Sequence, residues 1–299
     1  MNSNTIYIEP LTMAQSTLLI DIERLVERIK QTDPRQLQTL FPYITPKLKA
    51  YMALYRTGYD YSEHLQAFWH GCEQAGLLHG ENWLNIKTMD CLIESIRAYT
   101  QTKQFNRRVS DRRYQTKQNA NSIEQYANRL HQQYSRLLVI RVDFGYYSEY
   151  QHLVDIDLVY QHLDKMRLSR YNDGLFDHLV GSAWCVEQGE SKGYHIHGAY
   201  YFKGSEHQND WYMAQQIGER WVAMTEGLGT YHSCNTPKEK NSYEQRGKLG
   251  VGMIHRNDTV ACENAINAVG YLAKHEKDDQ YLRMKPTGRR AFATGASKL

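Results

Sequence analysis

Two histidines in the middle of the chain have the spacing of a metal-binding pair. His195 and His197 are separated by one residue within an otherwise apolar run, 194–202, that predicts a β-strand. Because side chains alternate along a strand, both imidazoles face the same way while Ile196 turns into the core. Two histidines on one sheet face can also be structural, so the pair needs a further ligand to indicate a metal site.

Glu187 supplies that further ligand. It ends the preceding predicted strand, 179–187, and the short polar turn that follows predicts a hairpin returning the chain beside it. A carboxylate together with two imidazoles makes a mixed nitrogen and oxygen site, for which we expect Mg²⁺ or Mn²⁺. The alternative is a salt bridge between Glu187 and Lys192 at the rim of the hairpin.

Tyr271 and Lys274 lie at the end of the last predicted helix, 259–274, where residues three apart share a face. A tyrosyl oxygen becomes a competent nucleophile when a neighbouring ammonium or a metal-bound phosphate favours the phenolate. The alternative is an ordinary helix end at which Lys274 opposes the helix dipole.

The predicted elements around these residues alternate between strands and helices. After a helix at 123–134 the order is strand, helix, strand, strand, helix, strand, helix, over 137–143, 150–170, 179–187, 194–202, 210–225, 251–255 and 259–274. A long Gly-, Asn- and Ser-rich loop is expected before the last strand. This order predicts an antiparallel sheet packed on helices, an α+β domain of the split βαβ type.

The first third of the chain has a different pattern of apolar residues. It predicts amphipathic helices and carries no catalytic constellation. We therefore divide the chain into a helical N-terminal region (1–106), a basic polar linker (107–122) and a catalytic domain (123–299).

The net charge of +3 does not by itself predict nucleic-acid binding, but basic residues cluster in two places. These residues are Arg107, Arg108, Arg112 and Arg113 in the linker, and Arg283, Lys285, Arg289 and Arg290 in the tail. Such clusters can neutralise phosphates, although each alone can equally be a solvated surface. Scattered cysteines, the lack of a signal peptide and the lack of a long apolar run predict a cytoplasmic protein with no membrane contact.

Together these motifs resemble a known family. The triplet His195-Ile196-His197 looks like the HUH motif of replication initiators and relaxases, Tyr271 to Lys274 looks like their tyrosine motif, and Glu187 is spaced like the third metal ligand of Rep proteins. With the 135–143 strand and the 288–292 tail, residues 121–299 are similar to the inovirus-type replication protein family, also called the YagK/YfjJ C-terminal domain family. The resemblance implies the HUH fold, with the histidine pair on the middle strand of a central antiparallel sheet, and gives Asp143 a supporting role.

The resemblance also implies a chemistry. His195, His197 and Glu187 would hold the metal, Tyr271 would attack the scissile phosphate to leave a 5′-phosphotyrosyl link, and Lys274 would steady the phosphate. The reaction would nick single-stranded DNA at a replication origin and begin rolling-circle replication of a phage or other mobile element. No nucleotide-binding P-loop motif is present, so a helicase and a polymerase would come from the host.

Three other functions share these motifs. An HUH transposase or relaxase would use the same chemistry in transposition or transfer. A DNA-binding regulator on the same fold would bind DNA without any metal dependence. A metal phosphoesterase would cut without a covalent protein–DNA adduct.

Overall fold

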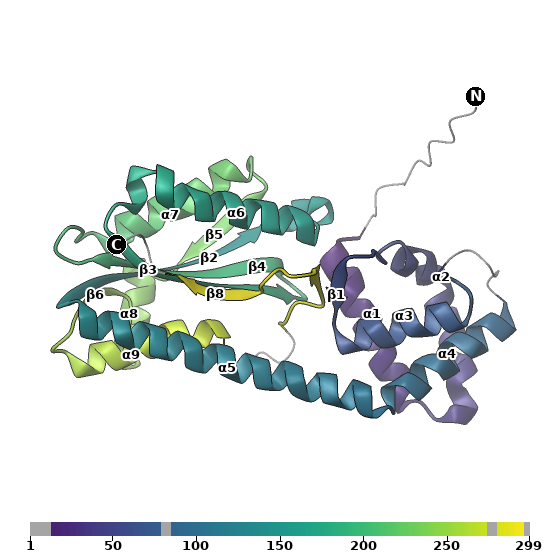
Figure 1. Ribbon diagram of the computed structural model, residues 1–299. Helices are drawn as coiled ribbons and strands as arrows, with labels where there is room; N and C mark the ends of the chain where they lie inside the picture. Colours follow the sequence, from purple (N-terminus) through teal and green to yellow (C-terminus); the bar gives the residue numbers. More distant parts are fainter. Residues whose placement is uncertain (1–12, 79–84, 274–279, 296–299) are drawn as a thin grey trace.

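A computed structural model describes residues 13–78, 85–273 and 280–295 of the 299-residue chain (Figure 1). The helices are α1 (Gln15–Gln31), α2 (Phe41–Met52), α3 (Glu63–Gln74), α4 (Ile86–Thr100), α5 (Lys103–Gln133), α6 (Ile156–Asn172), α7 (Asp210–Met224), α8 (Pro237–Gln245) and α9 (Thr259–Gly270), with 3₁₀ turns η1 (Pro34–Leu40), η2 (Ser148–Leu153), η3 (Gly174–Phe176) and η4 (Tyr271–Ala273). The strands are β1 (Tyr59–Tyr61), β2 (Arg136–Tyr146), β3 (Leu179–Gly189), β4 (Gly193–Lys203), β5 (Gly229–Ser233), β6 (Gly252–His255), β7 (Met284–Pro286) and β8 (Phe292–Gly295). Helices and antiparallel strands occur together, as the predicted α+β class requires.

The main sheet has the strand order β5-β2-β4-β3-β8, and β6 pairs with the first half of β2. Every pairing in it is antiparallel. The predicted hairpin is confirmed, because β3 and β4 pair in a register that sets Glu187 opposite His195. The histidine-bearing strand β4 therefore lies in the middle of the sheet, where neighbouring strands fix it on both sides.

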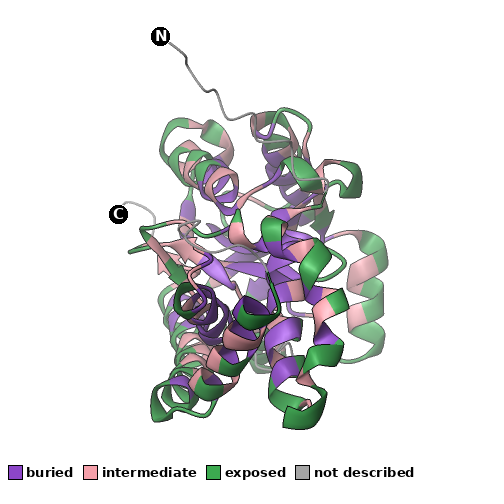
Figure 2. Ribbon diagram, turned by 90° about the vertical axis from the view of Figure 1, so that its right-hand side faces the viewer, coloured by how far each residue is buried: buried purple, intermediate pink, exposed green. Residues whose placement is uncertain are grey.

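Helices cover both faces of this sheet (Figure 1). On one face Ile196 and Tyr200 belong to a large buried cluster that includes side chains of α6 and α7. On the other face Ala199 and Tyr201 pack with the second half of α5 and with α9. Figure 2 shows the buried residues gathered at the centre of the molecule, on the strands and the inward faces of the helices. The alternation of β4 thus directs the histidines to the α5 and α9 face.

The predicted linker at 107–122 is helical. These residues form the middle of α5, one continuous helix of 31 residues. The segment contains neither Gly nor Pro, and its Arg, Lys and Gln residues have good helix propensity despite their polarity. Both ends of α5 are also anchored, with Phe105 buried among the N-terminal helices and Leu130 buried against the sheet. Packing at its two ends holds the polar middle in a helix.

The C-terminal tail crosses the predicted domain boundary. Strand β7 pairs with β1 of the N-terminal region, and β8 adds an edge strand beside β3. The Arg283 side chain, only 3% exposed, is paired with Glu23 of α1. The N-terminal helices and the tail are consequently joined by a strand pairing and a buried ion pair, which sequence position alone did not suggest.

Two further elements differ from the predicted ones. The expected loop after α7 contains β5, which pairs with β2, and α8, whose N-cap Thr236 and first-turn Pro237 favour a helix start. Helix α9 ends at Gly270 instead of residue 274, so Tyr271 begins a 3₁₀ turn. In the described part of the chain no helix is both long and apolar enough to cross a bilayer.

A buried histidine in α6 makes the stability of the fold sensitive to acid. His162 is 3% exposed, and its Nδ1 lies 3.0 Å from the Tyr146 hydroxyl. Burial, helped by the charge of Lys165, lowers the pKa of His162 to about 4. The folded state therefore keeps a neutral imidazole where the unfolded chain would be protonated, so stability present above pH 6.5 is lost as the pH falls toward 4.

For His162→Gln we expect a weaker acid sensitivity than for the native chain. Between pH 7 and pH 4.5 the native protein should lose roughly 2 to 3 kcal/mol more unfolding free energy than the variant. Urea titrations at both pH values measure the difference, and carboxylate protonation cancels because it is common to both proteins. Equal losses in the two proteins would show that His162 is not the responsible group.

Candidate metal centre

Three adjacent strands position the polar residues of the centre. Glu187 of β3 lies opposite His195 of β4, and Asp143 of β2 lies opposite His197 of β4. Directly opposed residues on antiparallel strands project to the same face of the sheet. All four side chains thus meet on the face covered by α5 and α9, and the two histidines do share a face as predicted.

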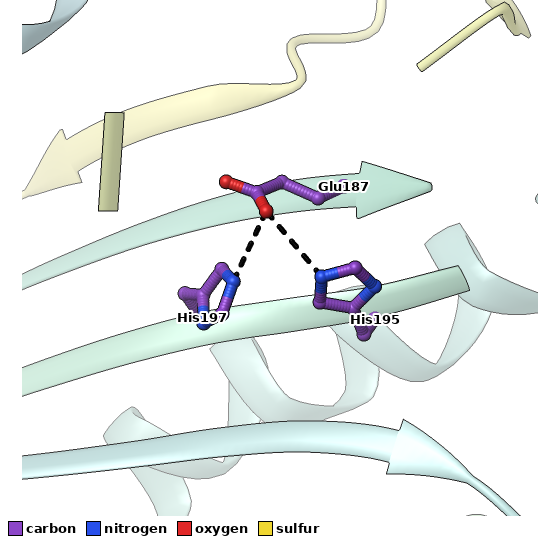
Figure 3. A group of neighbouring side chains, drawn as sticks. All are labelled: Glu187, His195 and His197. Carbon is purple, nitrogen blue, oxygen red and sulfur yellow. Dashed lines mark hydrogen bonds and ion pairs between the residues drawn. The ribbon is translucent and has the colours of Figure 1, made fainter. Parts of the chain in front are cut away.

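One carboxylate oxygen lies between the two imidazoles (Figure 3). Glu187 Oε2 is 3.1 Å from His197 Nε2 and 3.3 Å from His195 Nε2. One ligand atom from each of the three residues lies within 4.8 Å of the others, and all three residues are buried. These residues can hold a metal ion.

Each imidazole is oriented by an acceptor at its other nitrogen. His195 Nδ1 lies 3.1 Å from the Gly193 carbonyl oxygen, and His197 Nδ1 lies 2.7 Å from Asp143 Oδ1. A carbonyl or an ionised carboxylate only accepts, so each contact favours a proton on Nδ1 and leaves Nε2 as the ligand atom when a cation is bound. Such an acceptor at the other ring nitrogen commonly fixes the orientation of a metal-binding histidine.

The charges around His197 keep Asp143 ionised. Burial raises the pKa of Asp143, but the interaction with His197 and the charge of Arg141 outweigh it and lower the pKa to about 2. Conversely, burial lowers the pKa of His197, whereas its contacts with Asp143 and Glu187 raise it to a net value above the ordinary one. Asp143 therefore remains an anionic acceptor throughout the neutral range.

The chemistry of the donor set fits a cation. With both Nδ1 atoms protonated, two nitrogen lone pairs and a carboxylate oxygen converge at short range, an arrangement that is repulsive unless a proton or a cation stands between them. His195 Nε2 is buried and makes no hydrogen bond within the described ranges, 13–78, 85–273 and 280–295. A set of two imidazoles and one carboxylate is also typical of catalytic metal sites that keep an open position.

Tyr271 is linked to this centre through a residue that the sequence did not single out. The Arg141 guanidinium carbon lies 5.8 Å from the centroid of the Tyr271 ring, and Arg141 Nη2 lies 3.8 Å from Asp143 Oδ1. Arg141 and Asp143 are two residues apart on β2 and so share the sheet face that carries His197. The tyrosine is 38% exposed, and the adjacent Leu272 packs in the cluster on the α5 and α9 face of the sheet. The presence of an arginine within the otherwise apolar run 137–142 is the sequence signal that could have identified Arg141. Lys274, the other predicted member of the tyrosine motif, lies outside the described residues.

No family model, curated protein or solved structure matches this chain. The resemblance to the inovirus-type replication proteins therefore remains an expectation from the motifs.

The predicted nucleic-acid-binding residues fall into two groups. Four of them form ion pairs with other parts of the fold: Arg283 pairs with Glu23, Arg112 with Glu63, Lys285 with Asp60, and Arg289 with Asp164. The assignment is corrected for Arg283, whose side chain is buried and therefore cannot meet a phosphate at the surface. The others, Arg107, Arg108, Arg113 and Arg290, are exposed.

A cleft of about 330 Å³ opens beside the centre. Asp143 and His195 form part of its wall, together with Lys192 of the hairpin turn and His232 of β5. Lys192 thus lines the cleft, whereas the alternative prediction was that it forms a salt bridge with Glu187. A ligand in this cleft would lie against two residues of the centre and one cation.

Asp143→Asn tests the role of the acceptor at His197 Nδ1. The neutral amide no longer favours the Nδ1-protonated form of His197, so Mn²⁺ affinity should fall by roughly 10- to 100-fold. Calorimetric titration with Mn²⁺ measures the change, and Asp111→Asn, an exposed position on α5, is the control. Unchanged affinity in Asp143→Asn would mean that the 2.7 Å contact does not orient the ligand.

Proposed function

We propose that this chain is a metal-dependent nickase of single-stranded DNA that works through a tyrosyl–DNA intermediate on an HUH fold. One observation carries the proposal. The Tyr271 ring meets the sheet face of the ligand triad through Arg141 and Asp143. The proposed nucleophile, the partly buried Arg141 guanidinium and the three proposed ligands thus lie on one face of the sheet.

In the proposed reaction Tyr271 Oη forms a bond to the scissile phosphorus as the bond from phosphorus to the 3′-oxygen breaks. The phenolic proton is lost to solvent, and the departing 3′-oxygen takes up a proton. The 5′-phosphate stays on the tyrosine, so the phosphodiester energy is conserved and no nucleotide triphosphate is needed. A bound Mg²⁺ or Mn²⁺ would polarise the phosphate.

Arg141 is suited to hold the reacting phosphate. Its side chain is 11% exposed, and its Nε is buried with no hydrogen-bond partner among the described residues. A guanidinium presents donors in a fixed planar fork that matches phosphate oxygens. An unsatisfied donor beside the nucleophile would gain its partner only when substrate binds, which favours the transition state over the empty site.

For Arg141→Lys we expect the rate of adduct formation to fall by on the order of 10²-fold. Lysine keeps the charge but loses the fork, so affinity for uncleaved DNA should change little. Single-turnover kinetics separate the two quantities. A rate equal to that of the native chain would remove Arg141 from the proposed chemistry, and a matching loss of Mn²⁺ affinity would indicate a structural role through Asp143.

Formation of a covalent adduct is the direct test of the function. The full chain is incubated with a random single-stranded oligonucleotide pool and Mn²⁺, then separated under denaturing conditions. We expect a slower band that protease removes and that chelator prevents. Cleavage without an adduct would favour a metal phosphoesterase, and metal-independent DNA binding without cleavage would favour a regulator.

A polymerase would extend the free 3′-hydroxyl that the nick leaves, and unwinding would fall to a separate helicase. On this proposal the substrate is a replication origin of a phage or other mobile element, and the basic residues that remain exposed, such as Arg113 and Arg290, would contact its phosphates. A transposase or relaxase would show the same adduct and differ in the DNA sequence it selects.

A further inference from the structure

The edge strand β5 separates two hollows that adjoin each other. One is the 330 Å³ cleft beside the metal centre, and the other, of about 380 Å³, lies between β5 and the start of α7. Both are lined by Tyr231 and His232. We call the two hollows together the β5 groove; its defining residues are Asp143, Lys192, His195, Trp211, Tyr231 and His232.

Trp211 is the outer wall of this groove. It lies in the first turn of α7, where its indole is 49% exposed. The remaining lining of the outer hollow consists of Gln215, Tyr231, His232, Ser233 and Thr236. Aromatic faces next to hydroxyl, amide and imidazole groups, with no acidic side chain among them, are the surface on which unpaired bases stack.

The inner half of the β5 groove offers one cation to the phosphates of a polynucleotide backbone. Lys192 lines it, and its acidic residue, Asp143, is engaged by His197 and Arg141. A phosphate here would lie near a cation without facing a competing free carboxylate. The inner hollow of the β5 groove therefore borders the candidate metal centre at Asp143 and His195.

We propose that single-stranded DNA leaves the metal centre along the β5 groove and stacks a base on Trp211. The inference that single-stranded DNA is the occupant rests on the proposed function, whereas the stacking site at Trp211 rests on the lining of the groove. A peptide could instead add to the free edge of β5, but such an occupant would depend on backbone pairing and not on the indole.

Trp211→Ala tests the proposal, and the neighbouring residue provides a matched control. Tyr212 is 53% exposed in the same helical turn and does not line either hollow. Binding of a fluorescent oligothymidine to the full chain is followed by anisotropy in the presence of chelator, so that cleavage cannot occur. We expect Trp211→Ala to weaken binding by roughly 5- to 100-fold, Trp211→Phe to retain most of the affinity, and Tyr212→Ala to stay within about 2-fold.

Three results would contradict the proposal that DNA binds in the β5 groove. These are native affinity in Trp211→Ala, equal losses in Trp211→Ala and Tyr212→Ala, or no binding of the oligothymidine by the native chain. Circular dichroism melts of each variant check that the fold is intact. The outcome is separate from the nickase proposal, because Tyr271→Phe should bind the same probe normally. Trp211-dependent binding without any covalent adduct would contradict the proposed nickase activity but support DNA binding in the β5 groove. Adduct formation together with DNA binding that does not depend on Trp211 would support the nickase activity and contradict the groove proposal.

Discussion

Tyr271→Phe is expected to abolish the covalent protein–DNA adduct and to reduce nicking by on the order of 10³-fold or more. The substitution removes one oxygen atom, the proposed nucleophile, and keeps the ring that lies against the Arg141 guanidinium. Because the side chain is 38% exposed, loss of the hydroxyl should leave the stability of the fold close to that of the native chain. The loss should therefore lie in the chemical step and not in folding.

The measurement is adduct formation on single-stranded oligonucleotides with Mn²⁺, read by denaturing electrophoresis. Tyr114→Phe, at an exposed position on helix α5, is the control and should form the adduct at the native rate. An adduct of undiminished yield in Tyr271→Phe would assign the nucleophile to another residue. A peptide carrying the DNA, identified by mass spectrometry, would then name it.

His197→Ala is expected to have the second large effect, the loss of metal binding and with it of cleavage. His197 is the only one of the three ligands that contacts both Glu187 and Asp143, so its removal takes away a ligand and leaves two carboxylates without their shared partner. Mn²⁺ affinity should fall by more than the roughly 10- to 100-fold expected when only the Asp143 contact behind His197 is lost. DNA binding measured in chelator should be largely retained, since the β5 groove does not include this residue.

Calorimetry with Mn²⁺ and anisotropy with chelated protein test the two halves of this expectation. His64→Ala, another buried histidine paired with glutamates in the N-terminal helices, is the control for nonspecific loss of stability. If His197→Ala still cleaved DNA in a metal-dependent way, the ligand set would need revision. Equal activity of the native chain with and without chelator would contradict the metal assignment as a whole.

The ligand set was predictable because its geometry is local. Alternation along β4 places two residues of spacing two on one face, and a short polar turn returns the preceding strand beside them. Neither feature depends on the rest of the fold. The same holds for the amphipathic helices, whose apolar spacing already determines which face is buried.

The residues that contact the ligands from behind were only partly predictable. Asp143 was assigned a supporting role by the resemblance alone, and Arg141 was overlooked. Their importance follows from the pairing of β2 with β4 and from the approach of the Tyr271 turn, which no spacing rule describes. The β5 groove depends in the same way on a strand expected to be loop.

The sequence by itself determined the candidate chemistry of this protein: two imidazoles, a carboxylate and a tyrosine, with the strand period and the turn that group the first three. Only the tertiary structure decided which charges face a ligand and which hold the fold together. Arg283 and Glu23 are 260 positions apart, yet they form a buried pair, so this member of the basic cluster in the tail stabilises the fold. Backbone periodicity acts over a few residues and can be read along the chain, whereas ion pairing depends on distances that exist only after the chain has folded.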